Sequence, residues 1–104
     1  MEVNESIHLI IKKLLLEEPQ RNPYKRFTIL TYQLGEVGKS LRYAEIYPEE
    51  RKAHLAYLKS ALSDLLIQVL IMAELYGFDS NELATLGGDR LAEFRLRGKY
   101  VENE

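Results

Sequence analysis

Apolar residues recur at spacings of three and four along almost the whole chain, and this pattern constrains the fold more than any other feature. Residues at these spacings share one face of a helix, whereas a half-buried strand would alternate apolar and polar residues. No alternating stretch, internal repeat or low-complexity tract competes with the helical pattern. The sequence therefore predicts an all-α protein.

The first predicted helix begins after Asn4, a residue type that caps helix N-termini, and ends before Pro19. A helix of this length runs for about three turns. Residues 18–23 contain two prolines and are predicted to form a loop. The apolar face of the helix consists of Ile7, Ile10, Ile11, Leu14 and Leu15.

Two longer helices are predicted next. The second carries an apolar stripe typical of packing against a partner helix, made of Phe27, Leu30, Leu34, Val37 and Leu41. The third begins at Pro48, which suits the first helical position, and ends before Gly77, which suits the position after a helix. Its stripe consists of Leu55, Leu58, Leu62, Leu65, Val69, Met72 and Tyr76.

Residues 65–73 of the third helix are apolar at all but one position, which predicts cover on more than one side. In a chain of 104 residues we expect the extra cover to come from a second subunit. A capping box at residues 79–82 predicts a fourth helix, weakened at Gly87 and Gly88. Its apolar residues are Leu83, Leu86, Leu91 and Phe94.

Length and composition favour one domain over residues 1–104, with 46% hydrophobic residues. The net charge of −2, with both signs interspersed, argues against nucleic acid or an anionic membrane as partner. The absence of cysteine excludes disulfides and thiolate metal ligands, and fits the cytoplasm. The first residues are acidic where a signal peptide would be basic, and the apolar runs look too short to span a bilayer. We expect a soluble, cytoplasmic protein.

Carboxylates lie beside the apolar stripes of the second and third helices. Glu36 and Lys39, three residues apart, project side by side. Asp64 lies beside the next stripe, with Gln68 one turn beyond it. If the two helices pack antiparallel, Glu36 and Asp64 meet at the edge of the interhelical core. Carboxylates from facing helices form sites for hard cations such as Mg²⁺.

Four stretches resemble the MazG-like nucleoside triphosphate pyrophosphohydrolases: YKRF at 24–27, TYQLGEVGKSL at 31–41, LSDLLIQ at 62–68 and AELYGFD at 73–79. The resemblance covers roughly residues 20–99. It implies a four-helix bundle in which the second and third helices form the core pair and oligomerisation, as a homodimer or a dimer of dimers, completes the fold. It also implies that water held by Mg²⁺ attacks a nucleoside triphosphate, releasing pyrophosphate and a nucleoside monophosphate.

That family carries E-x-x-E on one helix and E-x-x-D on the next. Matched residue by residue, Glu36 and Asp64 take the first and fourth positions, whereas Lys39 and Ala61 replace the second and third acids. Glu36 and Asp64 are thus the predicted metal-binding and catalytic residues. Two carboxylates and one ammonium predict at most one weakly held Mg²⁺, with Lys39 neutralising both acids.

The resemblance also suggests substrate-binding residues, namely Tyr32, Lys39, Gln68, Arg95 and Arg97. Each of these residues can also have a purely structural role. Lys39 can form an ion pair with Glu36, and the arginines can complement the negative end of a helix dipole. Three functions therefore stay open: a weak nucleotide pyrophosphohydrolase, a nucleotide-binding protein without turnover, and a helical interaction or structural protein.

Overall fold

The structure is a computed structural model that describes residues 4–96, and it confirms the all-α prediction. No strand occurs within these residues. Two short 3-10 helices, Glu18–Arg21 and Pro48–Glu50, precede the second and third α-helices. The α-helices are α1 (Glu5–Leu14), α2 (Pro23–Ile46), α3 (Arg51–Leu75) and α4 (Ser80–Leu96).

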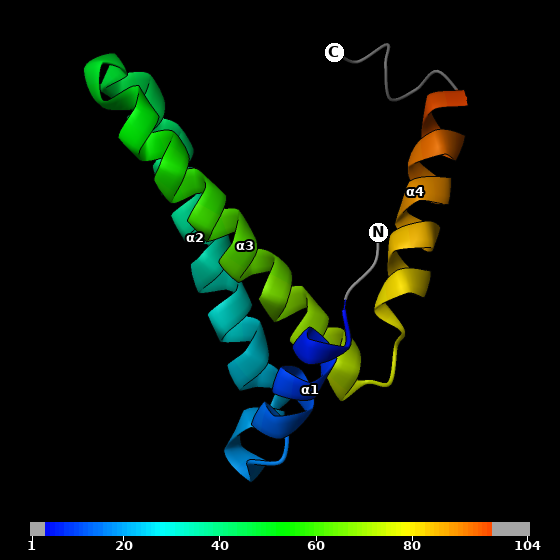
Figure 1. Ribbon diagram of the computed structural model, residues 1–104. Helices are drawn as coiled ribbons and strands as arrows, with labels where there is room; N and C mark the ends of the chain where they lie inside the picture. The colour runs from blue at the N-terminus through cyan, green and yellow to red at the C-terminus, as the bar shows by residue number, and fades with distance from the viewer. Residues whose placement is uncertain (1–3, 97–104) are drawn as a thin grey trace.

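Helices α2 and α3 form a long antiparallel hairpin, which is the main packing unit of the chain (Figure 1). Helix α1 folds back against the C-terminal half of α3, where Ile11 is buried with Leu70 and Ile71. Part of the cover expected for residues 65–73 therefore comes from α1 of the same chain rather than from a second subunit.

The helix ends follow local sequence signals. The side chain of Asn4 accepts a hydrogen bond from the Ile7 N–H at 3.0 Å, as predicted for an N-cap. Asn22 caps α2 in the same way, with Pro23 in the first helical turn. The prediction of a loop over residues 18–23 was wrong, because Pro19 and Pro23 both occupy first turns, where a missing N–H breaks no bond.

Helix α3 ends in a Schellman motif, as the position of Gly77 predicted. Gly77 has φ of +72°, its N–H donates to the Glu74 carbonyl, and the Phe78 N–H donates to the Ala73 carbonyl at 2.8 Å. The carboxylate of Asp79 then accepts from the Glu82 N–H at 2.9 Å and caps the start of α4. Helix α4 continues unbroken through its two adjacent glycines, so these do not interrupt it.

The residues of α2 that face α3 lie one position before those of the predicted apolar stripe. Phe27, Leu34 and Leu41 of the predicted stripe are 58%, 54% and 50% exposed. Because successive helix residues are rotated by about 100°, the residues that directly precede them face α3 instead. We call the inward-facing set the seam: Arg26, Gln33 and Ser40 of α2, with His54, Ala61 and Gln68 of α3.

Hydrogen bonds between polar side chains join α2 to α3 at one end of the seam. The buried guanidinium of Arg26 donates to Gln68 Oε1 at 3.0 Å and to Gln20 Oε1 at 3.2 Å. Its Nε has no hydrogen-bond partner among the described residues. Burial lowers the pKa of Arg26 below its ordinary value, because desolvation disfavours the charged form. The hairpin thus carries a buried cation that is held by amides rather than by a carboxylate.

Helix α4 stands away from the hairpin and meets it only near the end of α3, so that the chain forms an open V (Figure 1). Its apolar residues Leu86, Leu91 and Phe94 are exposed. The described residues of one chain therefore do not close a four-helix bundle.

One helical segment, Pro48–Leu75, is long and apolar enough to cross a membrane by length and composition alone. This criterion averages hydropathy over a window that includes Asp64 and Gln68, so it does not test the expectation that each uninterrupted apolar run is too short. The core helix of a soluble protein meets the same criterion.

Candidate functional site

A cleft of about 480 Å³ lies along one side of the α2–α3 hairpin. Small-molecule sites commonly occupy about 300–1,000 Å³. On each helix the lining residues are spaced by three and four, so each helix contributes one stripe to the wall. Helix α2 contributes Gln33, Glu36, Lys39, Ser40 and Tyr43, and α3 contributes His54, Tyr57, Ser60, Ala61 and Asp64.

The cleft brings together the four positions that match the family motif, Glu36, Lys39, Ala61 and Asp64. Glu36 is half-buried, Lys39 and Asp64 are exposed, and Ala61 is buried in the seam. The two carboxylates come from different helices and share this cleft with one ammonium. The arrangement suits a ligand that offers an anionic group to the ammonium and cationic or hydrogen-bond-donating groups to the two carboxylates.

Lys39 does not neutralise the two acids as the sequence suggested. Within residues 4–96 no ion pair joins it to Glu36 or Asp64. Its Nζ instead lies 5.8 Å from the centroid of the Tyr43 ring, in a cation–π contact. Because Lys39 and Asp64 are both solvent-exposed, neither needs a counter-ion for its own stability.

No group of three or more Asp, Glu, His or Cys side chains among residues 4–96 could hold a metal ion. The buried methyl group of Ala61 stands where the family motif has an acid. The residues present therefore do not fit a resident pair of Mg²⁺ ions, which needs several carboxylate oxygens.

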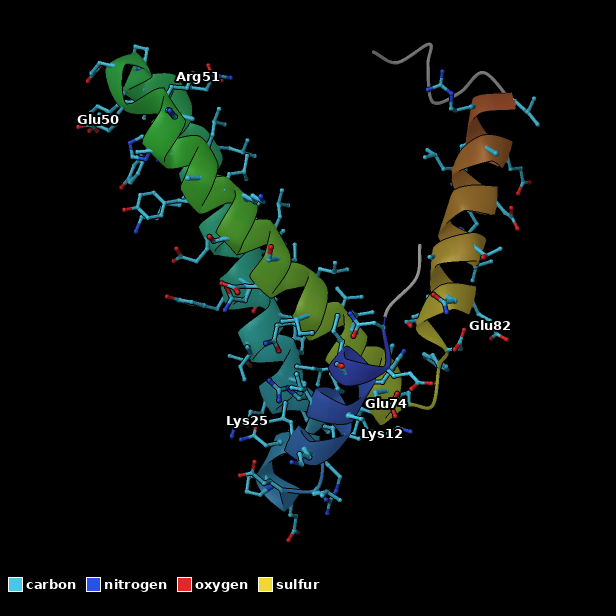
Figure 2. All side chains as sticks on the ribbon, in the orientation of Figure 1. Lys12, Lys25, Glu50, Arg51, Glu74 and Glu82 are labelled. Carbon is cyan, nitrogen blue, oxygen red and sulfur yellow. The ribbon has the colours of Figure 1, made fainter. Side chains whose placement is uncertain are left out.

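Aromatic rings form the other end of the cleft, near the hairpin tip where Figure 2 shows Glu50. The Tyr43 and His54 rings lie 5.7 Å apart, Tyr43 and Tyr47 lie 5.8 Å apart, and His54 and Tyr57 lie 6.3 Å apart. His54 Nε2 is 3.4 Å from Glu50 Oε2, in a geometry that makes no hydrogen bond. The cleft thus has a charged end and an aromatic end.

The sequence did not predict this aromatic end, since Tyr32 is the one tyrosine among the predicted site residues. A usable signal was present in the spacing. Tyr43 lies seven residues after Glu36 and Tyr57 lies seven residues before Asp64. Two helical turns place each tyrosine on the same face as the acid.

Most of the predicted substrate-binding residues lie outside the cleft lining. Tyr32 is exposed. The Gln68 amide oxygen accepts a hydrogen bond from Arg26 in the seam. Arg95 lies in the last turn of α4, which stands away from the hairpin, and Arg97 falls outside the described residues. Of this set, only Lys39 lines the cleft.

Comparisons with protein-family models, curated proteins and solved structures find no match to this chain. The interpretation of the site therefore depends on its own residues and on the motif resemblance described above.

Proposed function

We propose that the cleft binds a nucleoside triphosphate, in a MazG-like pyrophosphohydrolase type of protein whose turnover is weak or absent. The observation that carries this proposal is that a single cleft holds an ammonium in contact with a ring, two carboxylates and a wall of aromatic rings. A phosphate group pairs with an ammonium, and a planar base stacks on tyrosine or histidine rings.

Each end of the cleft takes a different part of the ligand in this proposal. Lys39 binds a phosphate oxygen, since no carboxylate within residues 4–96 occupies its Nζ. Tyr43 and Tyr57 contact the base, and Gln33 and Ser60 offer hydrogen-bonding groups to the base or the sugar. Both acids lie beside the phosphate end, so the triphosphate enters against their negative charge unless a cation accompanies it.

Magnesium would enter as part of the nucleotide complex and be held weakly, because only Glu36 and Asp64 supply protein carboxylates to the cleft lining. When bound, Mg²⁺ would neutralise phosphate charge. We assign no hydrolytic step to it, because the donor set does not fit the paired ions of the family pattern.

The test is calorimetric titration of the full chain with a panel of nucleoside triphosphates, with and without Mg²⁺, beside a pyrophosphate-release assay. Lys39→Ala should weaken binding about tenfold, as loss of one charge-assisted hydrogen bond does. Lys59→Ala removes an exposed ammonium that does not line the cleft and serves as the control. Absence of binding at millimolar nucleotide, or equal affinity of both variants, would refute the proposal.

A helical interaction or structural protein is the second candidate. It is favoured by the amount of apolar surface that the single chain exposes on α2, α3 and α4. The same titration separates the two functions, because a purely structural protein has no nucleotide affinity that depends on Lys39.

A further inference from the structure

The rings and the charges of the cleft follow one another along its length. Tyr43 of α2 contacts His54 of α3, with 5.7 Å between their ring centroids. Because the two helices are antiparallel, residues after His54 lie beside residues before Tyr43. Asp64, ten residues after His54, therefore lies about 15 Å from the aromatic end, near Gln33. The cleft thus has rings at one end and a carboxylate at the other.

Lys39 lies between these two ends. Glu36 precedes it by three residues and Tyr43 follows it by four, so about one helical turn separates Lys39 from each. Its ammonium contacts the Tyr43 ring at 5.8 Å, and no carboxylate of residues 4–96 forms an ion pair with it. The ammonium therefore lies on the ring side of Lys39, and the negative charge lies on the other side.

The charges of the cleft balance one phosphate group. Two carboxylates, Glu36 and Asp64, and one ammonium, Lys39, give the lining a net charge of −1. An ammonium forms a charge-assisted hydrogen bond with a phosphate oxygen. Among the described lining residues there is no second lysine or arginine for another phosphate. A second or third phosphate therefore adds repulsion from the carboxylates and gains no cation.

Reversing the ligand in the cleft does not change this balance. A base at the acid end would face Glu36 and Asp64 rather than a ring. Its phosphates would extend past Lys39 to the aromatic end, where Glu50 Oε2 lies 3.4 Å from His54 Nε2. The added phosphates would again approach a carboxylate. In either orientation, Lys39 is the partner of a single phosphate.

We propose that the cleft without metal selects a nucleoside monophosphate and accepts the triphosphate only together with a divalent cation. This inference rests on the proposed function, because it requires a base on the rings and a phosphate on Lys39. The phosphate next to the sugar pairs with Lys39, and a longer phosphate chain extends toward Glu36 and Asp64. A divalent cation on that chain neutralises the added charge and removes the preference.

The first measurement compares ligands that differ in phosphate number. Calorimetric titration of the full chain uses adenosine, guanosine, cytidine and uridine, each with no, one, two or three phosphates. In EDTA the monophosphate of the preferred base should bind about tenfold more tightly than its triphosphate, and more tightly than the nucleoside. In Mg²⁺ the triphosphate should bind at least as tightly as the monophosphate.

Each outcome of this titration decides between the two proposals. A triphosphate that binds as tightly as the monophosphate in EDTA would overturn this inference and leave the proposed function intact. The same holds for a monophosphate preference that persists in Mg²⁺. Absence of binding by every ligand, with and without Mg²⁺, would refute both.

The second measurement tests whether the carboxylates cause the preference. Glu36→Gln and Asp64→Asn remove one charge each at nearly constant size, so each should tighten triphosphate binding in EDTA about three- to tenfold. Monophosphate binding should stay nearly unchanged. Glu82→Gln removes the same charge from an exposed position of α4, which stands away from the hairpin (Figure 2), and should change neither affinity. Unchanged triphosphate affinity in both cleft variants, or an equal gain in Glu82→Gln, would overturn the inference.

Discussion

Lys39 Nζ lies 5.8 Å from the centroid of the Tyr43 ring, one turn further along α2. This contact joins the charged end of the cleft to its aromatic end. An ammonium that contacts a ring, and no carboxylate of residues 4–96, keeps its charge available for an incoming anion. In the proposed function Lys39 serves a ligand more than it serves the fold.

Replacement of Lys39 by alanine should consequently have little effect on stability. Lys39→Ala removes one exposed cation–π contact, which is worth about 0.5–1 kcal/mol of unfolding free energy. Urea denaturation followed by circular dichroism measures the difference. A loss of several kcal/mol would instead indicate that Lys39 compensates the two acids, as the sequence first suggested.

Completion of the MazG-like motif that the sequence resembles should make stability depend on metal. Lys39→Glu combined with Ala61→Glu places four carboxylates along the cleft, and their repulsion should lower the melting temperature in EDTA. Mg²⁺ at about one hundred times its Kd should then raise the unfolding free energy by about 2.7 kcal/mol.

The control for this double variant is Lys59→Glu combined with Ala53→Glu, which adds the same charge at exposed positions of α3 outside the cleft. If Mg²⁺ affects neither variant, or both equally, the four positions do not form a common site. Pyrophosphate release by the four-carboxylate variant alone would support the proposed likeness of the cleft to the MazG-like site.

Loss of Gln68 should cost more stability than loss of its partner Arg26. Gln68→Leu leaves a buried guanidinium without one of its two acceptors, at a cost of about 1.5–3 kcal/mol. Arg26→Met removes the buried charge together with its desolvation penalty, so its cost should be smaller. Urea denaturation of both variants, beside Arg42→Met at an exposed position of α2 as control, measures the order. The reverse order would contradict this account.

Alanine substitutions at Gly77 and at Gly87 should change the unfolding free energy in opposite directions. Gly77 has φ of +72°, so Gly77→Ala should lower the unfolding free energy by about 1–2 kcal/mol. Gly87 lies inside α4, and open space surrounds the position that an alanine methyl group would take there. Gly87→Ala should therefore raise the unfolding free energy by about 0.5–1 kcal/mol. Thermal unfolding of each variant tests the pair, and equal shifts would contradict the assigned helix end.

The helices were predictable because their signals are local. Asn4, Gly77 and Asp79 each determine a helix end through hydrogen bonds within a few residues, and the apolar spacing determines the helices between them. The closeness of Glu36 and Asp64 along one cleft also followed from spacing once an antiparallel hairpin was assumed.

The face of α2 that contacts α3 was not predictable in the same way. Periodicity identifies an apolar stripe, but it does not say whether that stripe faces the same chain or solvent in the isolated chain. In this hairpin polar and small residues such as Arg26 and Ser40 take the inner positions, and Leu34 is left outside. The contact between Lys39 and Tyr43 was missed for a related reason, because charge alone favoured a carboxylate as the partner of the lysine.

The hydrogen bond between Arg26 and Gln68 has a consequence for the hairpin as a whole. Seam residues recur every seven positions on both helices, so a slide of one repeat, about 10 Å, would preserve the apolar pattern. Small residues such as Ser40 and Ala61 would not resist that slide, but it would separate Arg26 from its acceptor. The hydrogen bond between Arg26 and Gln68 therefore fixes the register of the two helices at one end of the hairpin. Two residues that lie outside the cleft determine which side chains meet inside it.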